Sequence, residues 1–403
     1  MPSLNSTIDT MSLVLEHTPL LSSTSLPIAE ALGLPLTEDI GSNGYYPPFH
    51  KAMMDGYAVR TADAGKTVRV VGEIAASDVA TEYFPVGSCM AIMTGAPCPP
   101  GTEAVVKKEN TLRSGVGVTL PALIVPGQHI AAKGSECQED SLLLKKGTVV
   151  TPLVIATLAA FGIKTIKVFP YPSIAIITTG NELVRPGEKL GAAQIHDSNG
   201  PMLVAMAKSF GISNVTLLHA DDRLESLERA LEQVAKVEIV IFTGGASYGN
   251  YDIVPKALNR FGIEIIFHKV TNGSGKSFLF GEKSSQLFFG LQGNPLPCHM
   301  CFYRYVVPAI HQMAGKSLNR IYHSGKLTSP LSIKNGKCNG NDAHFILARA
   351  EIRNGGWQVT QVKTKSSADI FTIYSANSYI TLPPGVHDIS GGTTVDFLLI
   401  GEH

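Results

Sequence analysis

The stretch that decides the fold reads Ile239-Val-Ile-Phe-Thr-Gly-Gly-Ala-Ser-Tyr-Gly-Asn-Tyr-Asp252. Its first four residues are apolar and mostly β-branched, which is typical of a buried strand. They lead directly into a glycine-rich turn that contains Ser247 and ends near Asp252. In a parallel sheet such a turn lies at the carboxyl end of a strand, where α/β folds bind their ligands. The stretch therefore predicts a ligand site in an α/β domain.

The neighbouring segments repeat the order of strand, glycine loop and helix. Strands are predicted within four apolar runs, at 174–178, 215–218, 239–242 and 287–291. Helices are expected after Asn199, over 224–235, from about 252 and after Pro295. We expect Asn199 to cap the first of them, with Pro201 in its first turn. This alternation indicates a doubly wound parallel sheet.

The flanking regions have a different character. The first 34 residues are expected to contain a helix that ends near the Leu32-Gly-Leu-Pro35 break. From Gly41 to about Gly134, short β-rich runs alternate with turn clusters, which predicts a small β domain. After about Ser317, strands flank the hairpin signal Asn354-Gly-Gly356 and recur at 379–382 and 394–400, which predicts an all-β C-terminal domain.

Composition argues against several classes of protein. A chain of 403 residues exceeds what one hydrophobic core usually serves, so several domains are expected. Because 33 Lys and Arg balance 33 Asp and Glu, we expect no nucleic-acid or acidic-membrane partner. The six cysteines are scattered, which is typical of reduced thiols. With no secretory signal and no apolar run of about 18 residues, a cytoplasmic location without membrane spans is expected.

Three short motifs leave alternatives open. Cys298-His-Met-Cys301 lacks the second pair that a zinc site would want, so core-facing thiols on one helix are favoured over a redox or metal role. Gly245-Ala-Ser247-Tyr-Gly249 formally matches a nucleophile elbow. The downstream His268 and His299 are predicted inside secondary structure, however, and Gly244 favours a flat turn that a ligand can approach. Serine hydrolysis and a purely structural turn are the alternatives to a ligand cradle.

The segment Thr271-Asn-Gly-Ser-Gly-Lys-Ser277 resembles a phosphate loop. A Walker A motif needs glycine where Val270 stands, and a strand rather than a helix is predicted to follow. Lys276 in a glycine-flanked loop can still bind an oxyanion, because exposed N–H groups and an ammonium favour negative charge.

Acidic side chains follow three predicted strands of the same sheet, namely Glu182, Asp221 and Asp252. Because the carboxyl ends of parallel strands meet at one edge, these carboxylates are expected to converge. Oxygen ligands of this kind suit Mg²⁺ held jointly with substrate phosphates, and solvated loop carboxylates are the alternative. Asp55, before Gly56 in an apolar setting, is either a turn former or a functional carboxylate.

Taken together, these segments resemble one family, the molybdopterin molybdenumtransferases (MoeA and the gephyrin E domain). Matching segments follow the family's order across nearly the whole chain. They are Met54-Asp-Gly-Tyr-Ala-Val59, Met93-Thr-Gly-Ala-Pro97, Ala104-Val-Val106 with Glu109, Thr178-Thr-Gly-Asn-Glu-Leu183, Asp197-Ser-Asn199, the loop 244–252 and Leu291-Gln-Gly-Asn-Pro295.

The resemblance implies a mixed α/β and β multidomain chain. It would contain a doubly wound parallel α/β domain, a β-rich insertion domain and a C-terminal β-barrel-like domain. The implied division assigns 1–22 with 169–316 to the molybdopterin-binding α/β domain and 23–41 with 138–168 to a linker subdomain. Residues 42–137 would form a β-rich domain that reaches across a homodimer, and 317–403 the C-terminal β domain.

The resemblance also implies a reaction. Adenylylated molybdopterin and molybdate would be the substrates, Mg²⁺ the cofactor and AMP a product, with the molybdopterin adenylyltransferase as a partner. Asp55, Glu182, Asp221 and Asp252 would be catalytic, and Asp221 and Asp252 would hold Mg²⁺. The implied substrate-binding residues are Thr94, Gly180, Gly244, Gly245, Ser247 and Asn294. Lys276, Arg349 and Ser367 would contact molybdate, while Asp55 and Thr94 would come from the other subunit.

Three positions depart from the family pattern. The family's Gly-Glu-Asp turn is Gly134-Ser135-Glu136 here, which brings a longer acid. On the molybdate side, Gly273 stands where the family has one of two lysines, and Pro297 ends a motif that carries a hydroxyl in the family. They leave open a paralogue that binds the pterin nucleotide but has altered or lost oxyanion insertion, through tungstate use or a scaffold role.

Overall fold

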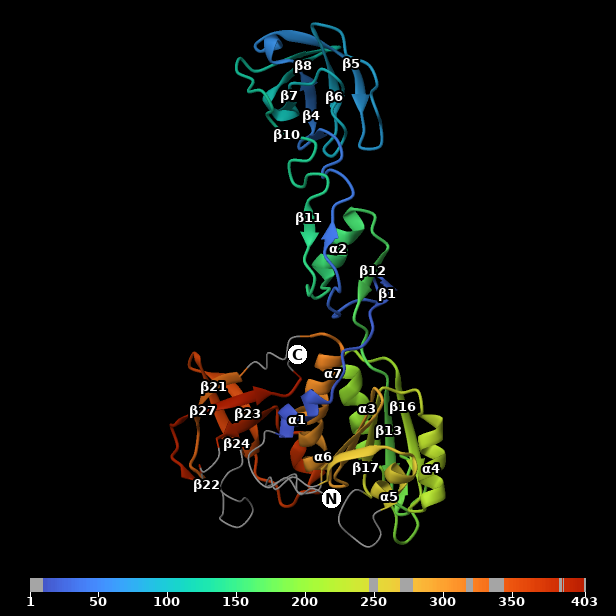
Figure 1. Cartoon of the computed structure of the whole chain (residues 1–403). Helices are drawn as coiled ribbons and strands as arrows, with labels where there is room; N and C mark the ends of the chain where they lie inside the picture. Colours follow the sequence, from blue (N-terminus) through green and yellow to red (C-terminus); the bar gives the residue numbers. More distant parts are fainter. Residues whose placement is uncertain are drawn as a thin grey trace. The chain divides into compact units, whose positions relative to one another are not determined.

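The structure, a computed structural model, describes residues 10–245, 253–268, 278–316, 322–332, 344–383, 386 and 388–401. The chain divides into two compact units (Figure 1). The first comprises Met1–Leu26, Ala31–Pro35 and Lys167–His403, and the second comprises Pro27–Glu30 and Leu36–Ile166.

A six-stranded mixed sheet forms the centre of the first unit. Its strands, in spatial order, are β16 (Val215–Ala220), β13 (Ile174–Thr179), β17 (Ile239–Thr243), β20 (Gln286–Leu291), β19 (Leu279–Lys283) and β18 (Glu264–His268). The first four run parallel, and β19 and β18 continue the sheet in antiparallel fashion. Ile174 pairs with Ile239, which pairs with Leu287, so the three central strands begin level with one another.

Helices cover both faces of this sheet. One face carries α1 (Thr10–Glu16), α3 (Asn199–Ser209), α6 (Pro295–Cys301), the π-helix η3 (Phe302–Val306) and α7 (Val307–Met313). The other face carries α4 (Leu224–Gln233) and α5 (Ile253–Arg260). Ile176 packs in the first core and Ile177 in the second, so β13 is apolar on both faces. The predicted doubly wound domain is confirmed, with two antiparallel strands added at one edge.

The C-terminal part of the first unit is a closed barrel. Its strands are β21 (Tyr322–Leu327), β24 (Gly356–Gln361), β23 (His344–Arg353), β25 (Ser378–Leu382) and β27 (Thr394–Leu399). The hairpin between β23 and β24 turns through Asn354 (φ 52) and Gly355 (φ 77), as its sequence predicts. Two short strands, β22 (Leu331–Ser332) and β26 (Asp388–Ile389), pair with each other, and α8 (Ile370–Ile373) precedes β25.

The second unit is β-rich, as predicted. Its main sheet contains β7 (Ala104–Lys107), β4 (Gly56–Val59), β6 (Ser88–Ile92), β5 (Thr67–Ile74), β9 (Gly117–Thr119) and β8 (Leu112–Ser114), in that order. Two small sheets pair β10 (Ile130–Ala131) with β3 (Lys51–Ala52) and β11 (Leu142–Leu144) with β2 (Ile40–Gly41). Helix α2 (Pro152–Ala160) begins after Thr151, whose hydroxyl accepts a hydrogen bond from the Val154 N–H.

The helix expected to end near Pro35 is shorter than predicted. Helix α1 ends at Glu16, and the chain becomes extended in β1 (Thr24–Pro27). Pro19 and Pro27 explain the difference, because the residue before a proline is disfavoured in helical conformation.

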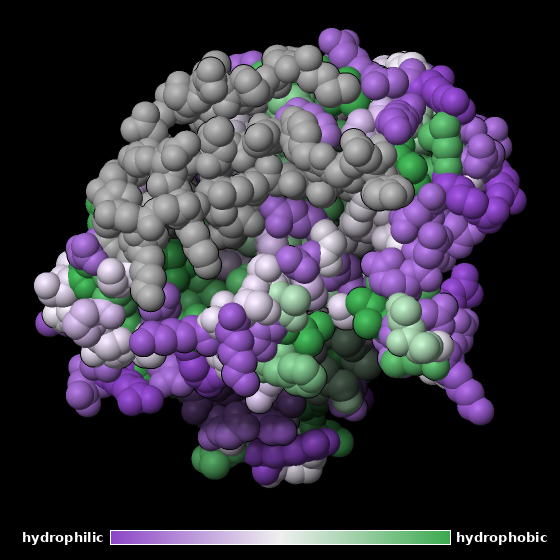
Figure 2. Space-filling view, turned by 90° about the horizontal axis from the view of Figure 1, so that it is seen from below, coloured by the Kyte–Doolittle hydropathy of each residue, from purple (hydrophilic) through white to green (hydrophobic). Residues whose placement is uncertain are grey.

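The surface offers no membrane-crossing element among the described residues, since none of their helices is long and apolar enough. Hydrophilic side chains predominate on the face seen in Figure 2, and smaller hydrophobic patches lie between them.

Candidate functional site

A cavity of about 860 Å³ lies at the carboxyl ends of the parallel strands. The last residues of β13, β17 and β20 all line it, namely Thr179, Thr243 and Leu291. Residues from the start of α3 and the start of α6 form further walls, and Ile370 and Phe371 of α8 complete the lining. This is the edge of the sheet at which α/β folds bind ligands.

Backbone, rather than side chains, forms the cavity wall after β17. Gly244 and Gly245 have φ angles of 91° and 60°. A Cβ atom on Gly244 would lie 2.5 Å from the carbonyl oxygen of Thr179, and one on Gly245 would lie 2.8 Å from Oγ1 of the same residue. Glycine is required at both positions, because any side chain would be strained and would collide with β13.

Asn199 ties the strand ends together at this edge. Its Nδ2 donates to Oγ1 of Thr243 at 2.9 Å and to the carbonyl oxygen of Gly293 at 2.6 Å. The prediction that Asn199 caps α3 is wrong, since Ser198 precedes the helix and the Asn199 amide turns toward the strands. Within the described part of the chain, Oδ1 of Asn199 and Oγ1 of Thr179 are buried without a hydrogen-bond partner. Unsatisfied polar atoms of this kind indicate a wall completed by water or ligand.

Glu182 lines the cavity from the loop after β13. Its carboxylate folds back over Gly180, whose φ is 145° and where a Cβ atom would lie 2.5 Å from Oε2 of Glu182. The loop is bonded to its neighbour after β16. Asn181 N–H donates to Oδ2 of Asp222 at 3.1 Å, and Asp222 N–H donates to Oδ1 of Asn181 at 3.0 Å. The two loops therefore hold their carboxylates at one edge of the sheet.

Asp221 follows β16 directly and forms an ion pair with Arg223. The guanidinium Nη2 lies 2.7 Å from Oδ2 of Asp221, and this hydrogen bond is the main reason why the pKa of Asp221 is lowered. The third predicted carboxylate, Asp252, lies outside the described residues, as do Ser247 and Lys276. No group of three or more metal-ligating side chains occurs in the ranges that the structure describes.

Asn294 and Ser367, predicted from separate motifs, lie in contact. Nδ2 of Asn294 donates to Oγ of Ser367 at 2.7 Å, and Leu296 N–H donates to the Ser367 carbonyl oxygen at 3.3 Å. These bonds attach the start of α6 to the segment before α8. Arg349, by contrast, does not line the cavity: its Nε lies 2.6 Å from Oε1 of Glu351 and its Nη1 donates to Ser375.

Asp55 and Thr94 form a pair in the second unit. Oδ1 of Asp55 accepts hydrogen bonds from Thr94 N–H at 2.8 Å and Thr94 Oγ1 at 2.7 Å. These two bonds, with a smaller effect from Lys108, hold the pKa of Asp55 below its usual value. The carboxylate is exposed and ionised at neutral pH, so the second unit presents a fixed negative charge at this turn.

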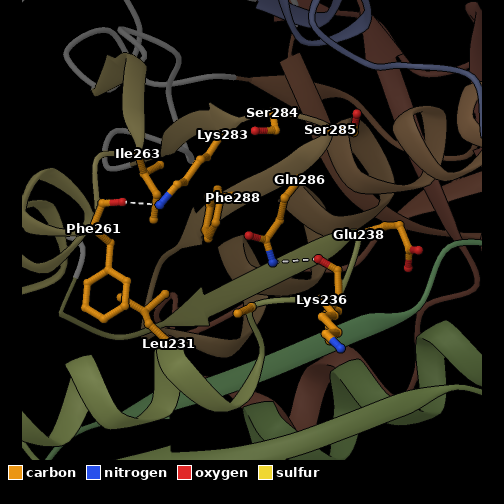
Figure 3. A pocket seen from close by; sticks show the side chains of 12 residues that line it. Leu231, Lys236, Glu238, Phe261, Ile263, Lys283, Ser284, Ser285, Gln286 and Phe288 are labelled. Atoms are coloured by element: carbon orange, nitrogen blue, oxygen red, sulfur yellow. Dashed lines mark hydrogen bonds between the residues drawn. The ribbon is translucent and has the colours of Figure 1, made fainter.

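A second cavity, of about 330 Å³, lies near the amino ends of β17 and β20 (Figure 3). Two of its polar side chains bond to backbone carbonyl groups nearby. Nζ of Lys283 donates to the Phe261 carbonyl oxygen, and Nε2 of Gln286 donates to the carbonyl oxygens of Val234 and Val237. These hydrogen bonds connect the loops around the cavity, so the two side chains are engaged by the fold and are not available to a ligand.

His268 and His299, the candidate catalytic histidines of a serine hydrolase, are buried and do not line the cavity. His268 lies in β18, and His299 lies in α6 with its Nδ1 2.6 Å from the hydroxyl oxygen of Tyr379. Burial lowers the pKa of His299 to about 4. Cys298 and Cys301 are also fully buried, and burial raises both pKa values to about 12. The prediction of core-facing thiols on one helix is confirmed.

Most residues that line the cavity have no site role predicted from the sequence, among them Thr179, Asp197 and Phe371. Asp197 had a usable signal, because an acid just ahead of a helix start accepts backbone N–H bonds. Asp197 lies two residues before α3, and its Oδ1 accepts from Gly200 N–H at 2.9 Å. No local sequence signal marks Phe371, because its position depends on the contact between the segment around α8 and the start of α6.

Three family models match consecutive parts of the chain. The MoeA N-terminal region (domain I and II) matches residues 6–162, the probable molybdopterin binding domain matches 175–312, and the MoeA C-terminal region (domain IV) matches 336–400. The molybdopterin molybdenumtransferase of Staphylococcus epidermidis RP62A is 31% identical over 93% of this chain and 90% of its own length. That of Bacillus subtilis 168 is 33% identical over 91% and 87%.

Solved structures agree with these matches. The molybdopterin biosynthesis moeA protein from Pyrococcus horikoshii superposes with a TM-score of 0.79 at 27% identity and covers 98% of both chains. Another solved structure, the molybdopterin biosynthesis moeA protein from Pyrococcus horikoshii OT3, gives a TM-score of 0.75 at 27% identity over 97% of this chain and 98% of its own.

Fold and site together define a multidomain α/β protein with a ligand cavity at the carboxyl edge of its parallel strands. The chain belongs to the molybdopterin molybdenumtransferase family. The predicted resemblance is thus confirmed, and with it the assignment to a transferase of molybdenum cofactor biosynthesis.

Proposed function

We propose that the chain inserts molybdate into adenylylated molybdopterin in a Mg²⁺-dependent reaction that releases AMP. The observation that carries this proposal is the carboxyl-edge cavity, which Glu182, Asn294 and the backbone of Gly244 and Gly245 line. Its volume of about 860 Å³ is within the range of small-molecule sites. Backbone wall and side-chain donors suit a phosphorylated ligand, because phosphate oxygens accept several hydrogen bonds at once.

Asp221 and Asp252 are the proposed Mg²⁺ ligands. Mg²⁺ commonly binds one or two carboxylates and completes its coordination shell with water and substrate phosphates. Of the two proposed ligands only Asp221 lies in the described residues, and one carboxylate there is compatible with such a site. When bound, the cation would neutralise phosphate charge and polarise the phosphorus that is attacked. Asp221 is already ionised at neutral pH, and Arg223 orients its carboxylate. Glu182 would face the nucleotide from the neighbouring loop.

The remaining substrate contacts would come from other segments. Lys276, Ser367 and Arg349 would bind molybdate, a dianion that needs charged or hydroxyl donors. Arg349 is paired with Glu351, so a contact with molybdate would require this ion pair to open. Asp55 and Thr94 would complete the site from the partner subunit of a homodimer. The four-part domain division, the cytoplasmic location and substrate supply by the molybdopterin adenylyltransferase belong to the same proposal.

The alternative function is a paralogue that binds the pterin nucleotide and has altered or lost oxyanion insertion. Pro297 favours it, because this buried residue lies in the first turn of α6, close to Asn294, and brings no hydroxyl there. Gly273, the other departure on the molybdate side, lies outside the described residues.

The test of the proposed function is AMP release from adenylylated molybdopterin by the full chain. We expect release with Mg²⁺ and loss of release on chelation. Asp221→Asn and Asp252→Asn should each slow release at least tenfold, because each removes a charged metal ligand. Glu232→Gln, which removes an exposed carboxylate of α4, is the matched control and should release AMP at the wild-type rate. Absence of AMP release from the wild-type chain would rule the proposal out.

A further inference from the structure

Two exposed aromatic side chains lie at α8, Phe371 within the helix and Tyr374 directly after it. Phe371 is 83% exposed and lines the cavity, while Tyr374 is 84% exposed and does not line it. Single exposed apolar side chains are common on protein surfaces, so exposure alone indicates nothing about Phe371. Its position in the lining of a polar cavity is what makes its open ring available to a bound ligand.

The segment that carries Phe371 is firmly held. Oδ2 of Asp369 accepts hydrogen bonds from Lys365 N–H at 2.9 Å and from Thr372 Oγ1 at 2.6 Å. Ile373 packs against the core on the α6 side of the sheet. Ser367 is bonded to Asn294 and Leu296, as described above. The exposure of Phe371 is therefore set by the fold and not by a loose loop.

The rest of the cavity is chemically different from this ring. Glu182, Asp197, Asn199 and the glycine backbone supply charge and hydrogen-bonding groups. A ligand that fits both regions needs a polar, charged part and a flat apolar face. Aromatic side chains bind such faces by stacking, and they do so for every nucleobase-like ring.

We propose that Phe371 stacks on a flat heteroaromatic ring of the bound ligand and so contributes to specificity for it. The inference rests on the proposed function, because adenylylated molybdopterin carries two such rings, the pterin and the adenine. Stacking is their shared chemistry, and the experiment below distinguishes the two rings.

The test measures equilibrium binding of two probes, AMP and 6-hydroxymethylpterin, to the full chain by calorimetry. Phe371→Ala should weaken binding of the stacked probe on the order of tenfold and leave the other probe unchanged. Phe371→Trp should restore the affinity, because it restores a π face. Phe371→Leu, which keeps apolar area without a π face, should stay weak. Tyr374→Ala is the matched control, since this ring is equally exposed outside the cavity, and should bind both probes normally.

Four outcomes would overturn the inference. They are wild-type affinity of Phe371→Ala for both probes, wild-type affinity of Phe371→Leu, equal losses in Phe371→Ala and Tyr374→Ala, and no binding of either probe to the wild-type chain. The AMP-release assay decides the proposed function separately. Normal release together with any of these outcomes means that the function stands and the stacking does not.

Discussion

Nδ2 of Asn294 lies 2.7 Å from Oγ of Ser367, across the junction between α6 and the segment before α8. The two residues are 73 positions apart in the sequence. Asn294 ends the loop between β20 and α6, whereas Ser367 lies between the barrel strand β24 and α8. Their hydrogen bond couples the α/β part of the cavity wall to the part that carries Phe371.

Breaking this bond should produce a measurable coupling. Asn294→Ala and Ser367→Ala, each alone, should lower the free energy of unfolding, and the double variant should lose less than the sum. A coupling free energy of about 0.5–1.5 kcal/mol is expected for one such bond. Urea unfolding followed by the fluorescence of Trp357, the single tryptophan, measures it. Ser366→Ala is the control, because Ser366 does not bond to Asn294. Strict additivity would show that the bond contributes nothing.

Gly180→Ala should impair catalysis more than stability. The added Cβ atom would lie 2.5 Å from Oε2 of Glu182, so the carboxylate must move out of its position at the cavity. We expect AMP release to fall at least tenfold. Gly187→Ala isolates backbone strain, since Gly187 also has a positive φ (93°) but has nothing within 4 Å of the added atom. Both variants should lose about 1 kcal/mol of stability. Equal rates of AMP release by the two variants would show that the position of the Glu182 carboxylate does not matter for the reaction.

His299 should make stability depend on pH. Its pKa is about 4 in the folded chain and about 6.5 when unfolded, so the unfolded chain binds more protons between these values. The contribution of neutral His299 to the free energy of unfolding is fully present above pH 6.5. It is lost as the pH falls toward 4, by on the order of 3 kcal/mol in total. His299→Gln should flatten this slope, whereas replacement of the exposed His50 should not. Urea unfolding at pH 4 to 7 measures it, and an unchanged slope in His299→Gln would contradict the assignment.

Cys298 and Cys301 should not react in the folded chain. Burial raises both thiol pKa values to about 12, so very little thiolate exists at pH 8 and reagents lack access. Mass spectrometry after alkylation should find both unmodified in buffer and fully modified in urea. Cys137, which is only half-buried, serves as the internal control for reagent activity. A disulfide between Cys298 and Cys301 in the native chain, or rapid alkylation of either thiol, would contradict this prediction and support a redox role for the pair.

The sequence predicts features that depend on local pattern. Apolar runs identify β13, β17 and β20, with β-branched residues in the first two, and the glycine turns after β13 and β17 identify the ligand edge. These signals succeed because a strand buried on both faces must be apolar throughout and its loop must allow close backbone approach.

Features that depend on distant partners could not be predicted. Asn199 has the sequence of a helix cap, but its amide is used by Thr243 and Gly293, which lie 44 and 94 positions away. The pairing of Arg349 with Glu351 was accessible in principle, because residues i and i+2 of a strand share a face. Lys276, Ser247 and Asp252 keep their predicted roles as proposals.

The most direct test of the whole account is formation of molybdenum cofactor from adenylylated molybdopterin, molybdate and Mg²⁺ by the full chain. Cofactor is measured by reconstitution of a molybdenum-free acceptor enzyme, and AMP is measured in the same sample. The account predicts one AMP released for each cofactor formed. Release of AMP without cofactor would contradict it and support the paralogue with lost insertion.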